Sequence, residues 1–320
     1  MFLKARNKMN TSEKSRRTSP STLPIEKQKH SVIVLIRKSL RPKQWTKNFF
    51  IFAGILFSQN IFNHALLLRV IFAFFIFCLL SGIGYIINDL TDVEQDRHHP
   101  TKSRRPIASG RLKHSYAIAT VALLTPLTLV MLYVLSPSFF VIALSYLLLQ
   151  LAYSFVLRRI VILDVFAVGC GFVLRVMAGA VVIDVTISHW FLICTILLAL
   201  FIALSKRRHE LIVLGEEAQH HRKTLSEYSP YLLDQMISVV TASTVIAYIL
   251  YTISAETMMK FGTGNLIFTV PFVLFGIFRY LYLVHKKMVG GSPEHILITD
   301  KPLMVDIFLW VLTVVIILYR

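Results

Sequence analysis

Long apolar runs separated by short polar stretches dominate the chain from about residue 45 to its end. A helix needs about 20 apolar residues to cross the hydrocarbon core of a bilayer, and we expect nine such helices. None of the runs alternates with period two, as the strands of a membrane barrel would. The sequence therefore predicts an all-α integral membrane protein, a nine-transmembrane-helix bundle within residues 31–320. The expected helices are roughly 45–61, 67–90, 115–134, 138–156, 160–183, 188–205, 231–254, 266–285 and 303–319.

The composition supports this class. Hydrophobic residues make up 55% of the 320 residues and charged residues 16%, against about 25% charged residues in a soluble domain. A soluble enzyme and a large extramembrane domain are therefore excluded. Residues 1–30 are polar and basic without an apolar stretch, so we expect no cleavable signal peptide there but a disordered cytoplasmic tail. Three cysteines lie inside apolar runs without CxxC spacing, and we assign them neither a disulfide nor a metal.

The basic residues predict the orientation. The formal net charge is +17, and with the N-terminus inside, 29 of the 34 Lys and Arg residues fall in cytoplasmic segments and only 3 on the opposite side. Basic residues collect in the cytoplasmic loops of membrane proteins. We therefore expect a multi-pass protein of the plasma (inner) membrane with a cytoplasmic N-terminus. The same rule explains the positive charge without nucleic acid, which we do not expect as a partner.

An acidic stretch ends the second expected helix. Asp89, Asp92 and Asp96 have the spacing i, i+3, i+7, which places them on one side of a helix, with Asn88 nearby. Three like charges repel unless something neutralises them, and Mg²⁺ typically joins carboxylates to substrate phosphate oxygens. We therefore predict Asp89, Asp92 and Asp96 as metal ligands, supported by Asn88. The alternative is a solvated helix end whose acids pair with the arginines that follow.

Those arginines belong to residues 97–113, RHHPTKSRRPIASGRLK, which contain six cations. Acids that bind Mg²⁺ beside a basic loop that binds phosphate are typical of a site for a phosphorylated or diphosphate substrate. His98 and His99 are adjacent and lack the spacing of zinc ligands.

NDxxDxxxD followed by RRPIASGR, at the cytoplasmic end of the second of nine helices, resembles the UbiA superfamily of intramembrane transferases. The resemblance covers all nine expected helices. It implies that the catalytic motif Asn88, Asp89, Asp92 and Asp96 binds a diphosphate through Mg²⁺. Most members carry a second DxxxD-like motif in the loop after helix 6, where this chain has SKRRHEL instead (205–211). Three consecutive cations suit a substrate with more phosphate charge than one prenyl diphosphate.

LRPKQWTKN (40–48) and KRRHEL (206–211) resemble one branch of the superfamily, the decaprenyl-type polyprenyl-phosphate phosphoribosyltransferases. That branch implies phosphoribosyl diphosphate as donor, a polyprenyl phosphate lipid as acceptor and pyrophosphate as leaving group, and a product that serves as an arabinan precursor in cell envelope biosynthesis. Because several anionic groups must converge, we expect mainly basic residues from four cytoplasmic segments to bind substrate. The candidates are Lys43, Lys47, Arg104, Arg105, Arg111, Tyr153, Arg158, Asp164, Lys206, Arg207 and Glu210.

Other interpretations stay open at this point. A UbiA-type aromatic prenyltransferase of quinone biosynthesis fits the same aspartate motif. A polyprenyl-phosphate transporter is disfavoured because the acids cluster at one face rather than at the midplane, and a CDP-alcohol phosphotransferase would need a DGxxAR stretch that is absent. Arg175 and Arg279 lie within expected helices, where a structural and a substrate-binding role are equally compatible with the sequence. The sequence leaves the prenyl chain length and the oligomeric state, including a homo-oligomer, undetermined.

Overall fold

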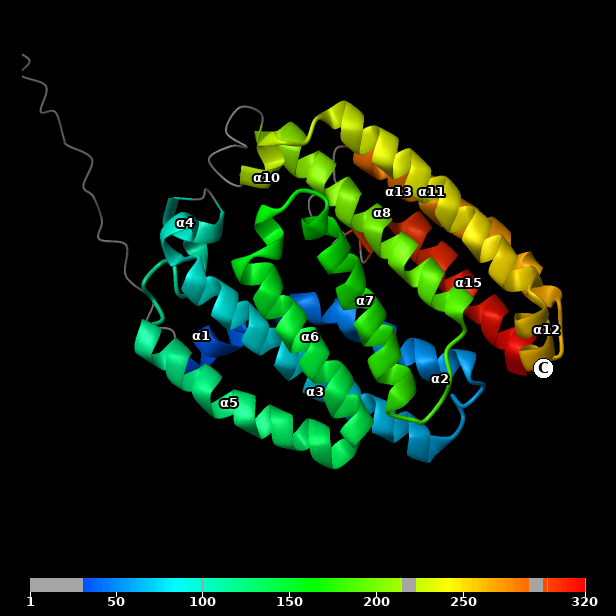
Figure 1. Cartoon of the computed structure of the whole chain (residues 1–320), viewed down its shortest axis with the longest axis horizontal. Coiled ribbons are helices and arrows are strands. Elements are labelled where there is room, and N and C mark those ends of the chain that lie inside the picture. Colours follow the sequence, from blue (N-terminus) through cyan, green and yellow to red (C-terminus); the bar gives the residue numbers. More distant parts are fainter. Residues whose placement is uncertain (1–30, 99–100, 215–222, 288–295, 298, 320) are drawn as a thin grey trace, which may run out of the picture. The chain divides into compact units, whose positions relative to one another are not determined.

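The computed structural model describes residues 31–98, 101–214, 223–287, 296–297 and 299–319, so the expected tail 1–30 lies outside it. Every regular element among these residues is a helix (Figure 1). The first half of the chain forms α1 (Val32–Ser39), η1 (Pro42–Phe52), α2 (Ala53–Phe57), α3 (His64–Thr91), α4 (Val93–His98), η2 (Lys102–Arg104), α5 (His114–Leu135), α6 (Pro137–Phe155) and η3 (Leu157–Arg159). The second half forms α7 (Leu163–Val181), α8 (His189–Leu214), α10 (Lys223–Ser226), α11 (Pro230–Ile253), α12 (Ala255–Phe261), η5 (Asn265–Thr269), α13 (Val270–His285) and α15 (Lys301–Tyr319).

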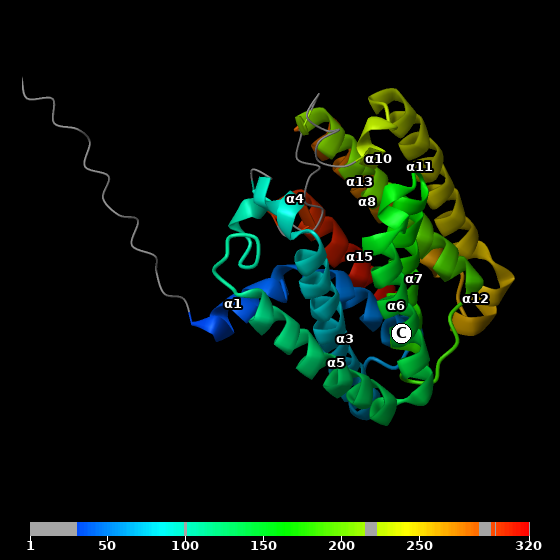
Figure 2. The ribbon, with the colours of Figure 1, turned by 60° about the vertical axis from the view of Figure 1, so that its left-hand side comes forward.

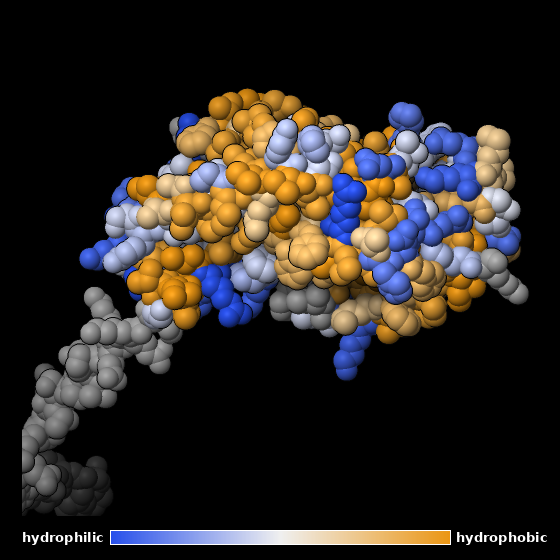
Figure 3. All heavy atoms as spheres, turned by 90° about the horizontal axis from the view of Figure 1, so that it is seen from below, coloured by the Kyte–Doolittle hydropathy of each residue, from blue (hydrophilic) through white to orange (hydrophobic). Residues whose placement is uncertain are grey.

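Eight helices in the described part of the chain are long and apolar enough to cross a membrane. The prediction of an all-α, multi-pass membrane protein is therefore confirmed. Apolar side chains cover much of the surface in Figure 3, as contact with lipid requires. The expected ends agree with these helices to within three residues except in α8, which continues to Leu214, and in α13, which begins at Val270 because η5 forms the first turns of the expected helix 266–285. The stretch KRRHEL is thus helical and not a loop, since Glu210 pairs with Arg207 and Lys206 one turn before it.

The count of nine long helices is not confirmed, because residues 45–61 form η1 and the short α2 instead. This segment still extends along α3. Arg41, just before it, bonds to Asp89 near the end of α3, and Asn63, just before α3 begins, donates to the carbonyl of Asn60. A 3₁₀ helix rises ~2.0 Å per residue and an α-helix ~1.5 Å, so η1 and α2 together span about 30 Å. That length equals the hydrocarbon thickness of a bilayer.

η1 packs closely against α7. A Cβ atom on Gly179 of α7 would lie 1.8 Å from the carbonyl oxygen of Ile51, so only glycine allows this approach of the two backbones. A buried arginine of α7 strengthens the same junction. Arg175 donates to the side chain of Asn48 in η1 at 2.8 Å and to the hydroxyl of Tyr146 in α6 at 2.7 Å. Of its two open interpretations, the contacts of Arg175 favour the structural one.

The contacts of Arg279 also favour a structural role. Its guanidinium in α13 forms two bonds with the carboxylate of Asp300, at 3.1 and 2.8 Å. The same carboxylate accepts the backbone N–H of Leu303 at 3.0 Å and so caps the N-terminus of α15. Because its partner is a helix cap, Arg279 fixes α13 to the start of α15.

Two hydrophobic cores meet at α7. One core joins α2, α3 and α6 to the C-terminal half of α7, and the other joins α8, α11 and α13 to its N-terminal half. Figure 2 shows α3 and α7 within the bundle. In α3, 56% of the most apolar stretch is buried, and in α7 61%, more than in any other of the eight helices. These two central helices also hold two of the acidic residues that the sequence singled out, Asp89 in α3 and Asp164 in α7.

We predict that Gly179→Ala lowers the free energy of unfolding by about 2 kcal/mol or more, because the added methyl group displaces η1 from α7. Gly84→Ala is the matched control, since its Cβ would meet nothing closer than Gln150 at 3.9 Å. That control should be neutral or slightly stabilising, because alanine is the better helix former. Thermal unfolding of both variants in detergent tests this, and equal midpoints would contradict the tight junction.

Candidate active site at the end of α3

Two of the three predicted carboxylates share a guanidinium. Asp89 and Asp96 are almost completely buried, and Arg105 from the following loop bonds to Asp89 at 3.0 Å and to Asp96 at 2.5 Å. Arg41, just before η1, bonds to the same oxygen of Asp89 and lies over the ring of Tyr85. Burying carboxylates is costly unless they are paired, and here each has at least one arginine.

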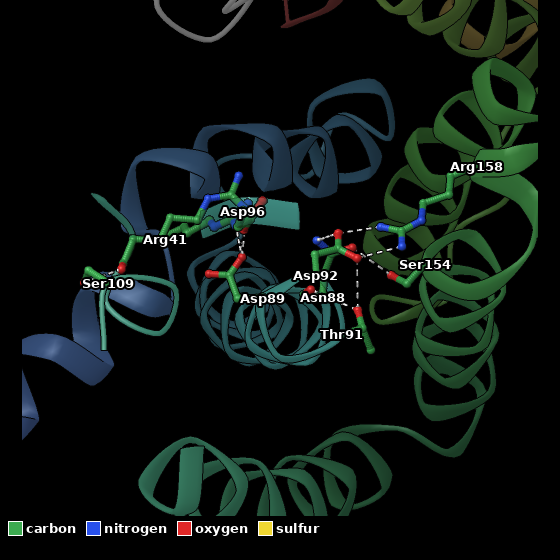
Figure 4. A network of polar contacts seen from close by, with 10 residues as sticks. Arg41, Asn88, Asp89, Thr91, Asp92, Asp96, Ser109, Ser154 and Arg158 are labelled. Carbon is green, nitrogen blue, oxygen red and sulfur yellow. Dashed lines mark hydrogen bonds and ion pairs between the residues drawn. The ribbon is translucent and has the colours of Figure 1, made fainter. Parts of the chain in front are cut away.

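The third carboxylate faces another direction (Figure 4). α3 ends at Thr91 and α4 begins at Val93, so Asp92 lies at the break between them. Arg158 from η3 binds both oxygens of Asp92, at 2.5 and 2.6 Å. Asn88 donates to Asp92 at 3.1 Å and accepts from Ser154 of α6. The prediction that all three carboxylates lie on one side of a helix is therefore wrong for Asp92, because the break turns this side chain toward η3.

The acids are therefore neither solvated nor unpaired. The alternative interpretation correctly anticipated pairing with arginines, but only Arg105 comes from the segment that follows. Arg41 and Arg158 are far away in sequence, and together the three arginines bring η1, the loop 101–113 and η3 to one helix end.

A second buried group lies at the start of α7. Asp164, fully buried, accepts from Arg207 of α8 at 2.9 Å and from the hydroxyl of Tyr228 at 2.9 Å. Arg207 also donates to Glu210 at 2.6 Å and to the hydroxyl of Tyr153 at 3.2 Å. The next residue along α8, Arg208, points elsewhere and binds Asp234 of α11. Four predicted substrate-binding residues thus converge, although they come from three helices. They are Tyr153, Asp164, Arg207 and Glu210.

Acids of both groups act on one residue, Lys102. Its pKa is lowered, mainly by burial and further by the charge of neighbouring Arg105, while the charges of Asp96, Glu210 and Asp92 act in the opposite direction. A lysine that is influenced by acids of both groups indicates that they belong to one polar region.

The other predicted residues lie farther out. Lys47 is half-buried on η1 and Lys206 is 3.9 Å from Glu210, whereas Lys43, Arg104 and Arg111 are exposed. Arg111 bonds within its own loop, to Ser109 and the carbonyl of Arg104. Within the described ranges, no ion pair joins Lys43, Arg104 or Arg111 to the three aspartates. His99 falls outside those ranges.

The sequence reasoning did not select Arg41, Ser154 or Tyr228. Arg41 lies in the same basic motif as Lys43 and Lys47, so the motif was the available signal, but nothing in the spacing distinguishes its three cations. Ser154 and Tyr228 have no signal at all, since their partners Asn88 and Asp164 are 66 and 64 residues away in sequence.

We predict a strong coupling between Asp92 and Arg158. Asp92→Asn or Arg158→Gln should each lower the free energy of unfolding by about 3 kcal/mol, because each leaves a partly buried charge unpaired. The double variant should lose less than the sum of the two. The exposed pair Arg97–Glu94 is the control, and its coupling should stay below about 0.5 kcal/mol. A double-mutant cycle by chemical unfolding in micelles measures both couplings, and similar values would contradict the prediction.

Comparison with known proteins identifies the group to which this architecture belongs. The model of the UbiA prenyltransferase family matches residues 48–288. A decaprenyl-phosphate phosphoribosyltransferase of Corynebacterium glutamicum is 33% identical over 290 residues, which cover 88% of this chain and 86% of the relative. The enzyme of the same name from Mycolicibacterium smegmatis is 32% identical, with 87% and 90% covered.

Solved structures agree on the fold. A UbiA homolog from Archaeoglobus fulgidus, bound to GPP and Mg²⁺, superposes with a TM-score of 0.68 at 18% identity, covering 89% of this chain and all of that one. A digeranylgeranylglyceryl phosphate synthase gives 0.63 at 19% identity, with 89% and 98% covered. The family match, the near full-length relatives and the shared helical fold lead to one conclusion: the chain belongs to the UbiA prenyltransferase family.

Proposed function

We propose that the chain transfers the 5-phosphoribosyl group from phosphoribosyl diphosphate to a decaprenyl-type polyprenyl phosphate and releases pyrophosphate. The reaction would take place at the cytoplasmic face of the plasma membrane, with the N-terminus inside. The observation that carries this proposal is the meeting of arginines from three separate segments with the carboxylates at one helix end. Such a cluster suits a substrate with several phosphate groups.

The relatives support the choice within the family. Both named relatives are decaprenyl-phosphate phosphoribosyltransferases and match over nearly their whole length. The second buried group supports it as well, because Arg207 and Lys206 add cations to the polar region that Lys102 links to the aspartates. A donor with both a diphosphate and a separate 5-phosphate would need two cationic areas of this kind.

The residues at the end of α3 fit a magnesium ion. Asp89 and Asp96 already hold one cation between them, the guanidinium of Arg105. Mg²⁺ is usually bound by one or two carboxylates together with substrate phosphates and water. In the described part of the chain, no three Asp, Glu, His or Cys side chains are grouped for a metal, so a magnesium ion here would need phosphate oxygens of the substrate as further ligands. Asp92, here bound by Arg158, is the third predicted ligand. When bound, Mg²⁺ would neutralise charge on the leaving diphosphate.

The chain's own residues would do the remaining work by binding and orientation. Arg41, Arg105 and Arg158 carry the charges that can bind diphosphate oxygens. An oxygen of the lipid phosphate forms a bond to the anomeric carbon, and the bond from that carbon to the diphosphate breaks. Since the attacking phosphate is already anionic at neutral pH, no general base is required. Catalysis then depends on positioning and on stabilising the leaving group.

A labelling experiment tests the function. Membranes containing the protein are incubated with labelled phosphoribosyl diphosphate or, separately, with a labelled polyprenyl diphosphate and an aromatic acceptor. We expect label to enter a lipid phosphate from the first donor only. Label entering an aromatic ring from the second would instead support an aromatic prenyltransferase.

Chelation provides a separate prediction. Removing divalent cations with EDTA should abolish transfer, because the diphosphate would lose a counter-ion between Asp89 and Asp96, and Mg²⁺ in excess should restore it. Unchanged transfer after chelation would rule out the magnesium assignment without ruling out the donor.

We predict that Asp89→Asn lowers the rate of transfer at least ~100-fold, because it removes a carboxylate that would hold Mg²⁺ beside the leaving diphosphate. Glu94→Gln changes a carboxylate in the same stretch, but this side chain is 77% exposed and, among the described residues, pairs only with Arg97 on the surface. The control should stay within about twofold of the unsubstituted protein. Equal rates for both variants would refute the role of Asp89.

A further inference from the structure

The connection between η3 and α7 contains a strained turn. Ile162 has φ 71° and ψ −48°, and the N–H of Leu163 donates to the carbonyl of Val161 at 2.9 Å. This combination is a γ-turn of the rare form that has positive φ at its centre. For a β-branched residue such a conformation is strongly unfavourable. Strain of this kind persists only where surrounding contacts enforce it.

One side chain provides those contacts. The hydroxyl of Tyr228 accepts the N–H of Ile162 at 2.7 Å and donates its own proton to Asp164 at 2.9 Å. Tyr228 and Asp164 are both buried, so neither bond is readily replaced by water. Burial raises the pKa of Tyr228 to about 12, so the phenol keeps the proton that it donates to the carboxylate.

Along the chain, the strained turn lies between two charged residues of the site, Arg158 and Asp164. Four residues before it, Arg158 binds Asp92, and two residues after it, Asp164 binds Arg207. The segment that carries Tyr228 touches the first of these positions again, because Thr224 donates to the carbonyl of Arg158 at 3.3 Å. A change in the turn would therefore alter how Arg158 and Arg207 are placed relative to each other.

Packing alone does not account for the arrangement. Ile162 is 45% exposed, so burial of its side chain does not explain why the turn is strained. The ring of Tyr228 belongs to the core shared by α8, α11 and α13, but phenylalanine would fill that space equally well. Only the hydroxyl makes the bonds to the turn and to Asp164.

We propose that Tyr228 is a positioning residue, whose hydroxyl holds the Ile162 turn in its strained form and thereby sets Arg158 and Arg207 for the phosphorylated donor. This rests on the proposed function insofar as the donor is phosphoribosyl diphosphate. In the described part of the chain, no hydrogen bond joins Tyr228 to the three predicted metal ligands, and the residue acts through the turn and through Asp164.

The test compares Tyr228→Phe with the double variant Tyr228→Phe/Ile162→Gly. We expect Tyr228→Phe to raise KM for phosphoribosyl diphosphate about tenfold, the effect of one lost hydrogen bond, and to change kcat less than about threefold. Glycine adopts positive φ without strain. The double variant should therefore regain most of the affinity although the hydroxyl is still missing. Should Tyr228→Phe give little folded protein, the double variant should also recover the yield.

Hydrogen exchange provides a readout independent of transfer. Amides in a peptide covering the turn should exchange faster in Tyr228→Phe, whereas Tyr231→Phe, at a tyrosine that is 75% exposed in the next helix, should leave them unchanged. An unchanged KM and unchanged exchange in Tyr228→Phe would overturn the proposal, and so would a double variant no better than the single one. If the unsubstituted protein fails to use phosphoribosyl diphosphate, the proposed function is wrong, while the exchange experiment still tests the turn.

Discussion

The pairing of buried carboxylates with arginines is the interaction on which this structure depends. Asp89, Asp92 and Asp96 lie at and just beyond the end of α3, which is more than half buried, in surroundings where an unpaired charge costs several kcal/mol. Their three arginine partners come from parts of the chain that would otherwise have little reason to meet. These ion pairs thus determine which connecting segments lie at this end of the bundle.

Backbone strain accompanies this pairing. Arg41 has φ 52° and precedes a proline, a position that normally favours extended backbone. Ile162, with φ 71°, lies between Arg158 and Asp164. Arg41 is itself a charge of the candidate site, and Ile162 lies close in sequence to two of its charged residues. Strained backbone lowers local stability and is typical of positions that direct functional groups. Among the described residues, the apolar parts of the helices show no comparable feature, since the other two non-glycine residues with positive φ, Gln59 and Asp184, lie in connections.

The sequence was sufficient to predict most of the architecture, because a bilayer imposes a length and a hydropathy on every crossing helix. It also identified the acidic stretch, Arg105 and Arg158, since charged residues beside membrane helices are few. It failed for the first crossing, because the apolar composition of this segment suits an α-helix and a 3₁₀ helix equally well. Contacts distant in sequence accompany the 3₁₀ form, among them the close approach of Gly179 to Ile51 and the bond from Arg175 to Asn48. Arg41 and Tyr228 were missed because their roles depend on tertiary partners. The orientation of the protein in the membrane, the phosphoribosyl donor and the magnesium ion are predictions.

Arg207 and Arg208 are neighbours on α8, yet one binds Asp164 of α7 and the other Asp234 of α11. Successive residues of a helix are rotated by about 100°, so the two pairs hold α8 at one rotation about its axis. A single residue inserted or deleted between the membrane-embedded part of α8 and this pair would turn both arginines away from their acids at once. Substitutions along α8 can be accommodated one at a time, but its length up to residue 207 is fixed by geometry.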